Sequence, residues 1–184
     1  AAGPTGYQTI FQNAAETTSS TASQADVIES ALRTVAFEKQ GLDALEAALQ
    51  NGLGEPFRRT IDAILATTGR VIITGVGKSG HIGVKMAASL SSTGTPTSFV
   101  HAAEAAHGDL GMIAQNDVVL ALSKGGESAE LKSIVAYTRR FSIPLIALTC
   151  NASSSLGRAA DIVLLLPDAQ EACPHGLAPT TSTL

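Results

Sequence analysis

Two short loops rich in glycine, serine and lysine carry the residue types that bind anions. The first loop, Gly75-Val76-Gly77-Lys78-Ser79-Gly80, and the second, Ser123-Lys124-Gly125-Gly126-Glu127-Ser128, each follow a short apolar run. Each loop leads into a segment with helical periodicity, so its backbone N–H groups and hydroxyls meet the positive end of a helix dipole. Two such loops on neighbouring strands favour a phosphorylated small molecule as the ligand.

The glycine spacing of the first loop also fits two nucleotide-binding motifs. A G-x-G-x-x-G loop that binds a dinucleotide needs an acidic residue at the end of the next strand. The corresponding run here ends Phe99-Val100-His101. A Walker loop would need a glycine where Ile72 stands. Both nucleotide motifs are therefore disfavoured, and a tight turn that requires glycine would not explain Lys78 and Ser79.

The apolar pattern predicts an α/β fold, a three-layer doubly wound sandwich with about five parallel strands. Apolar runs of strand length alternate with segments of helix length, which is typical of a parallel sheet covered on both faces. Ligands bind beyond the carboxyl ends of such strands, where both loops fall. Two N-terminal helices are expected before the sheet, from Asp26 to Gly52 and over 55–67. The predicted strands are 71–74, 97–100, 118–122, 144–148 and 162–166, and the predicted helices between them are 79–92, 129–141 and 154–159.

Composition excludes several other classes of protein. The chain has 184 residues, 45% of them hydrophobic and 15% charged, which suits one domain with a sizeable core. A net charge of −4 and the lack of tryptophan argue against nucleic acid as a partner, and no apolar run has membrane-spanning length. Cys150 and Cys173 suggest free thiols in a reducing compartment. Residues 1–25 are expected to be a flexible lead-in and 26–184 the domain.

The sequence resembles the arabinose-5-phosphate isomerases of the KpsF/GutQ type, within the sugar isomerase (SIS) domain family. The resemblance runs from about residue 30 to the end. It implies the SIS fold and the interconversion of ribulose 5-phosphate and arabinose 5-phosphate through an enediol(ate). This reaction serves 3-deoxy-manno-octulosonate (KDO) synthesis for lipopolysaccharide or capsule. The motifs that carry the resemblance are GVGKSGHIG from Gly75, STGTP from Ser92, HAAEAAHGDLGM from His101, GES from Gly126 and EACPHGLAPTTST from Glu171.

The resemblance also implies a cytoplasmic homotetramer that needs no cofactor and that zinc can inhibit. The implied catalytic residues are Lys78, Glu130 and Glu171. Lys78 would stabilise the oxyanion or help to open the sugar ring, and either glutamate would be the base. From the residues alone, each glutamate would more often be structural, and Glu130 would merely complement a helix dipole. The implied substrate-binding residues are Ser79, Gly94, Thr95, His101, His107, Ser123, Lys124, Gly125 and Ser128.

His101, Glu104 and His107 are spaced three residues apart. If this segment is helical, adjacent members share a face and could bind a metal. The resemblance implies that His107 contacts the inhibitory zinc. A polar helix rim that bonds to sugar oxygens is favoured over a resident metal, because no third protein ligand is evident.

The sequence departs from the family pattern at two places. Gly125 replaces the second serine of the family loop S-x-S-G-x-S/T, and a lost hydrogen bond to a charged group costs about 1.5–3 kcal/mol. A weaker hold on phosphate is therefore expected unless Lys124 compensates. The chain also stops at Leu184, before the family's His-Pro-Gly-Gly segment and without CBS domains, so the SIS domain is expected to be C-terminally incomplete. These departures keep open an alternative function, a non-catalytic phosphosugar-binding module of a sensor or regulator.

Overall fold

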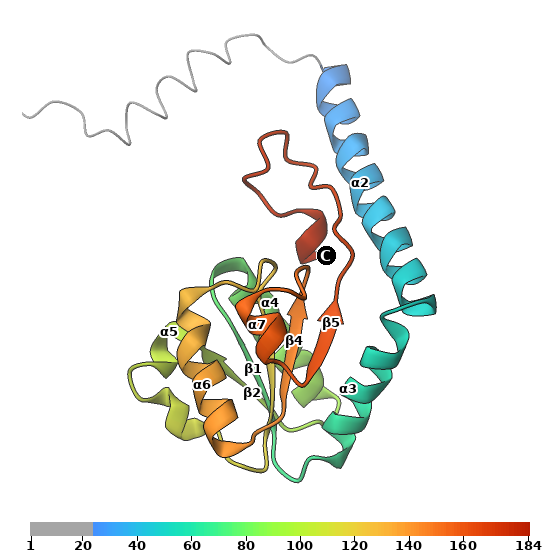
Figure 1. Ribbon diagram of the computed structural model, residues 1–184. Helices are drawn as coiled ribbons and strands as arrows, with labels where there is room; N and C mark the ends of the chain where they lie inside the picture. The colour runs from blue at the N-terminus through green and yellow to red at the C-terminus, as the bar shows by residue number, and fades with distance from the viewer. Residues whose placement is uncertain (1–23) are drawn as a thin grey trace, which may run out of the picture. The chain divides into compact units, whose positions relative to one another are not determined.

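A computed structural model describes residues 24–184, and its centre is one five-stranded parallel sheet (Figure 1). The strand order is β2-β1-β3-β4-β5, and every neighbouring pair is parallel. The predicted doubly wound sheet is therefore confirmed. The strands are β1 (Val71–Gly75), β2 (Thr97–His101), β3 (Val118–Leu122), β4 (Leu145–Thr149) and β5 (Ile162–Leu165).

Helices cover both faces of the sheet, as Figure 1 shows. Val71 and Ile73 pack against α3 and α4 on one face, whereas Ile72 packs toward α5, α6 and α7 on the other. The strands are buried on both faces because they are apolar at nearly every position. The covering helices are α3 (Gly54–Ala66), α4 (Gly77–Ser92), α5 (Ala102–Ala105), α6 (Lys132–Phe141) and α7 (Ser155–Ala159), with 3₁₀ turns η1 (Asp109–Met112) and η2 (Ala129–Leu131).

The long helix α2 (Gln24–Gln50) precedes the sheet, as predicted. The chain divides into two units, Ala1–Ala36 and Phe37–Leu184, and the division falls within this helix. The predicted lead-in lies outside the described residues except for its last two positions, so the predicted domain limits stay a prediction. Within residues 24–184, no helix is long and apolar enough to cross a lipid bilayer.

The strand order creates a crevice between β1 and β3. From β1 the chain continues through α4 to β2 on one side, whereas β3 lies on the other side of β1 and leads to β4. Connections that diverge in this way leave a ligand-binding crevice at the carboxyl ends of the two strands. Gly75 at the end of β1 pairs in register with Leu122 at the end of β3. The two Ser/Gly loops therefore start side by side.

Candidate functional site

The first loop turns sharply from β1 into α4 at Gly77. Gly77 has φ 56°, a left-handed conformation that glycine adopts without steric cost. No side chain caps this helix, and the first intrahelical bond runs from Gly80 N–H to the Val76 carbonyl. The N–H groups of the first turn thus stay available beside the exposed Lys78 and the half-buried Ser79. This arrangement suits an anion.

The second loop curves into a cup, which is bordered by the hydroxyls of Ser123 and Ser128 and by backbone N–H groups of the loop. Ser123 Oγ lies 3.0 Å from Ser128 Oγ, and the Gly126 N–H donates to Ser123 Oγ at 3.1 Å. Gly126 has φ 69°, and a β-carbon there would collide with Ser154. Within residues 24–184, some backbone N–H groups of this loop donate to no other group; they are those of Lys124, Gly125, Glu127 and Ser128.

The carboxylate of the second loop is turned away from the cup. Glu127 accepts hydrogen bonds at 2.7 Å from both the N–H and the hydroxyl of Ser155, at the start of α7. The Ser155 hydroxyl and N–H hold the pKa of the Glu127 carboxyl below its ordinary value. These bonds hold the charged carboxylate at the start of α7, where the loop's hydroxyls and free amides do not face it.

The two loops meet in one pocket, as predicted. Ser79 from the first loop lines it together with Ser123 and Lys124 from the second. The end of β4 closes the floor, because Cys150 N–H donates to the Lys124 carbonyl at 2.9 Å. Burial raises the pKa of the Cys150 thiol, which therefore stays neutral. The pocket can offer an anion hydroxyls, amides and one ammonium group.

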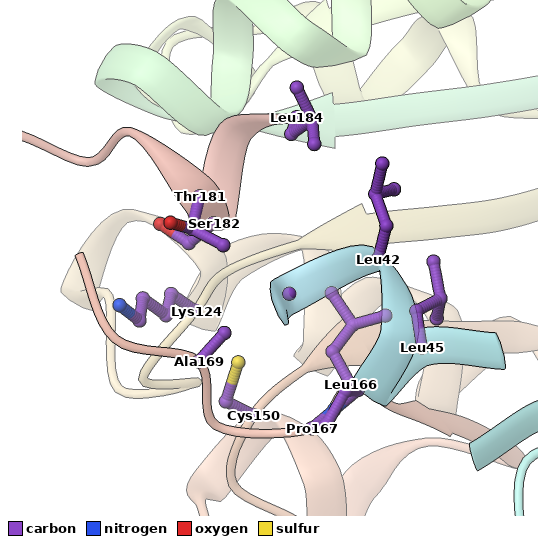
Figure 2. Close-up of a pocket in the computed structure, with 11 residues that line it drawn as sticks. Leu42, Leu45, Lys124, Cys150, Leu166, Pro167, Ala169, Thr181, Ser182 and Leu184 are labelled. Carbon is purple, nitrogen blue, oxygen red and sulfur yellow. The ribbon is translucent and has the colours of Figure 1, made fainter. Parts of the chain in front are cut away.

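A C-terminal segment, residues 166–184, returns over this edge of the sheet. It starts where the Leu166 N–H donates to the Thr149 carbonyl and ends in the 3₁₀ turn η3 (Thr181–Thr183). Ser182 lines the pocket opposite the second loop. Figure 2 shows Lys124, from the second loop, below Thr181 and Ser182 of this segment, at the same end of the neighbouring pocket.

Glu171 ties the C-terminal segment to the second loop. Its Oε1 accepts from Lys124 Nζ at 2.8 Å, while its Oε2 accepts from the Thr180 N–H at 2.7 Å, the Thr180 hydroxyl at 3.1 Å and the Ser182 N–H at 3.4 Å. Burial alone would raise the pKa of Glu171. The hydrogen bonds from Lys124, Ser182 and Thr180 outweigh burial and hold that pKa far below its ordinary value.

The predicted catalytic residues come from three elements of the same unit. Lys78 stands in the first turn of α4, Glu130 in η2 directly after the second loop, and Glu171 in the C-terminal segment. Lys78 and Glu130 are exposed, and within residues 24–184 neither forms an ion pair. Lys78 and Glu130 therefore do not pair with each other in the described part of the chain. Glu171 pairs with Lys124 instead.

Gly94 and Thr95 do not join the other predicted substrate-binding residues within this chain. They form the tight turn from α4 to β2, with Gly94 at φ 92°. The next residue, Pro96, accepts from the Val71 N–H at 2.9 Å at the start of β1. Gly94 and Thr95 thus lie at the amino edge of the sheet, opposite the two loops. The order of the motifs in the chain does not reveal this position. Because β2 runs parallel to β1, α4 first carries the chain back to the amino edge of the sheet.

The histidine-containing segment is helical only over Ala102–Ala105, so the helix that would align its side chains is too short. His101 ends β2, beside Gly75 in register and therefore at the same edge as the two loops. His107 is exposed beyond the helix, and Gly108 follows with φ 132°, a conformation that no helix contains. Within the described residues, no three His, Cys, Asp or Glu side chains gather as a metal site would require.

The sequence did not reveal how the C-terminal segment contributes. Thr180 and Ser182 lie within the motif that starts at Glu171, but the motif does not show what they contact, and Lys124 and Glu171 stand 47 residues apart. The only available signal was that a lysine follows one strand and a glutamate follows another, on a sheet edge that they share.

The parallel sheet, with two Ser/Gly loops at its switch point, defines a doubly wound α/β protein with a candidate site for a small anionic ligand. A sequence model of the SIS domain matches residues 64–184, and the chain belongs to the SIS domain family. The resemblance and the SIS fold expected from the sequence are both confirmed.

Curated relatives that are similar to the chain include arabinose 5-phosphate isomerases named KdsD. The chain is 49% identical to that of Pseudomonas aeruginosa over 158 residues, which are 86% of this chain and 47% of the relative. It is 49% identical to that of Escherichia coli strain K12 over 137 residues, 74% of this chain and 42% of the relative. The chain therefore spans about half the length of the curated relatives it matches.

Solved structures are similar over most of the chain. The protein c3406 of Escherichia coli CFT073, in complex with arabinose 5-phosphate, is 38% identical with a TM-score of 0.79, over 88% of this chain and 84% of that chain. A protein of Listeria monocytogenes is 25% identical with a TM-score of 0.81, over 88% of this chain and 83% of that chain.

A close contact between α2 and the C-terminal segment gives the first test. A β-carbon on Gly41 would meet the Cγ2 methyl of the buried Thr181. We expect Gly41→Ala to destabilise the protein by about 1–3 kcal/mol through overpacking. Thr181→Ser removes that methyl group and keeps the hydroxyl, so Gly41→Ala should be tolerated in the Thr181→Ser background. Urea unfolding of the four proteins measures this coupling, and equal effects of Gly41→Ala in both backgrounds would contradict the contact.

Proposed function

We propose that the protein is an aldose–ketose isomerase that interconverts ribulose 5-phosphate and arabinose 5-phosphate. The observation that carries this proposal is the meeting of two anion-binding loops in one pocket, with Lys78, Glu130 and Glu171 on the same or adjoining segments. The similarity to KdsD isomerases and to a structure in complex with arabinose 5-phosphate supports the choice of sugar. The reaction would serve KDO synthesis for lipopolysaccharide or capsule.

The reaction moves hydrogen between two neighbouring carbons and needs no external oxidant. A base takes the proton from C1 of the ketose, the C–H electron pair becomes the C1–C2 double bond, and the carbonyl pair moves to O2. The resulting enediolate takes a proton at C2 while the O1 proton is lost, which leaves an aldehyde at C1. Carbon C1 is oxidised and C2 is reduced, so no redox cofactor is required in this proposal.

The phosphate group would be held by the second loop and by the first turn of α4. The free amides of the second loop can donate to phosphate without breaking a bond within residues 24–184, the two serine hydroxyls can turn their donors to it, and the dipole of α4 adds attraction. The phosphate lies far from C1 and C2 in the sugar, so its binding energy can position the reacting end. Ser79, Ser123, Ser128 and the amide of Gly125 are the proposed phosphate ligands, and His101 is placed to contact the sugar.

The proposed catalytic roles follow from charge and exposure. Lys78 is exposed in the first turn of α4, forms no ion pair within residues 24–184, and would stabilise the enediolate oxygen. Glu130 and Glu171 are the candidates for the base. Glu171 is ionised and held by several donors, so it must lose a donor before it accepts a proton. Contact of His107 with inhibitory zinc remains a proposal.

A cytoplasmic homotetramer is part of the same proposal. An exposed apolar stripe on α3 supports self-association, because its residues recur every four positions along one helix face. The stripe consists of Phe57, Ile61 and Leu65, with exposed fractions of 48%, 41% and 77%.

Turnover of ribulose 5-phosphate in deuterium oxide tests the function directly. We expect arabinose 5-phosphate that carries deuterium at C2, because the enediolate is reprotonated from solvent-exchanged groups. Lys78→Met should lower kcat by about 10²–10³. Lys85→Met should leave kcat unchanged, because Lys85 is an exposed lysine of the same helix, about two turns further along. Saturable binding of arabinose 5-phosphate without any deuterium incorporation would instead favour the non-catalytic phosphosugar-binding module.

Gly125 offers a test by gain of function. A β-carbon on Gly125 meets nothing within 4 Å, and its backbone needs no glycine, so a serine fits. We expect Gly125→Ser to add one hydroxyl to the phosphate cup and to lower KM about tenfold at unchanged kcat. Gly111→Ser, at an equally open position outside the site, is the matched control. An unchanged KM for Gly125→Ser would contradict the placement of phosphate in the second loop.

A further inference from the structure

The two oxygens of the Glu171 carboxylate have different partners. The three hydrogen bonds to Oε2 all come from Thr180 and Ser182, in the same C-terminal segment. Within the described residues 24–184, the hydrogen bond to Oε1 comes from Lys124 Nζ. One oxygen therefore anchors the segment, and the other is covered by a single ammonium group.

The Lys124 ammonium is the movable partner of this pair. The Lys124 side chain is 45% exposed, whereas that of Glu171 is 12% exposed. A lysine carries its charge on a flexible four-carbon stem with three donors, so it can change acceptor without a change in the backbone. Glu171 cannot follow, because Oε2 is fixed by the segment that also packs Thr181 against Gly41.

Lys124 also belongs to the proposed phosphate loop. Its own N–H is one of the unpaired amides of the cup, and its side chain lines the pocket that Ser79 and Ser123 share. A phosphoryl dianion in the cup would bring a larger negative charge than a carboxylate, within reach of the same ammonium. Gly125 offers no hydroxyl there, so the phosphate has a vacant hydrogen-bonding position for Lys124 to fill.

We infer that Lys124 is a substrate-responsive positioning residue, which covers Glu171 Oε1 in the free protein and moves to the phosphoryl group of the bound sugar. This inference rests on the proposed function. Transfer of the ammonium uncovers Oε1 only when a phosphorylated substrate is present. Oε1 can then take the proton from the sugar carbon and later return it.

The electrostatics around the pair agree with this role. Bonding to Lys124 keeps Glu171 a weak proton acceptor, and loss of that cation raises the pKa of a carboxyl toward the range useful for a base. The other titratable groups that face Lys124 are Asp168 and Cys150. Burial keeps the Cys150 thiol protonated, so it does not compete for the ammonium. The pKa of Lys124 itself is raised by its bond to Glu171, so it stays charged.

The test follows the Glu171 side-chain carboxyl by carbon NMR during acid titration, with and without saturating sulfate. Sulfate is the probe because it stays a dianion at acidic pH values where phosphate is already a monoanion, and the amide signals of Gly125 and Ser128 report its binding. We expect sulfate to raise the Glu171 titration midpoint by roughly one to three pH units in the wild type and in the control Lys85→Met. In Lys124→Met the midpoint should be raised already and should not respond to sulfate.

Two other outcomes would each overturn a different claim, either the role of Lys124 or the proposed phosphate site. Sulfate that shifts the loop amides and leaves the wild-type Glu171 midpoint unchanged overturns the inference alone. Sulfate that leaves the loop amides unchanged overturns the proposed phosphate site, and the inference with it. The wild-type measurement stands by itself if Lys124→Met fails to fold.

Discussion

The parallel register between β1 and β3 is the constraint on which the site depends. Gly75 and Leu122 pair in register, so β1 and β3 end at the same level of the sheet. The loop after each strand then leads into its own helix. The unsatisfied amides of a helix start and of the second loop are thereby gathered in one crevice. Burial of both strands on two apolar faces fixes this register, because a slip would carry polar loop residues into the core.

Around that constraint the chain arranges charge so that the crevice attracts an anion. Glu127 accepts hydrogen bonds from Ser155, which hold its carboxylate at the start of α7. Lys124 lines the pocket beside the second loop and forms an ion pair with Glu171. The same carboxylate also holds the C-terminal segment over the pocket. Glu171 therefore both positions this segment and neutralises the Lys124 ammonium.

Much of the fold could be predicted because the apolar strands are short, uninterrupted and bounded by glycine or polar residues. The meeting of the two loops could also be predicted, since carboxyl ends of parallel strands share an edge. The positions of Gly94 and Thr95 could not be inferred from motif order, because a helix reverses direction between them and the first loop. The bond between Lys124 and Glu171 depends on how a C-terminal segment without regular structure folds back, and no local pattern encodes that path.

Binding of phosphate where the two loops meet is the central claim. A crystal structure of the protein with arabinose 5-phosphate tests it most directly. We predict phosphoryl oxygens within hydrogen-bonding distance of Ser123 Oγ, Ser128 Oγ and the Gly125 N–H, with the sugar directed toward Lys78. A phosphate bound elsewhere, or a sugar whose phosphate faces Lys78 and whose aldehyde end occupies the second loop, would contradict it.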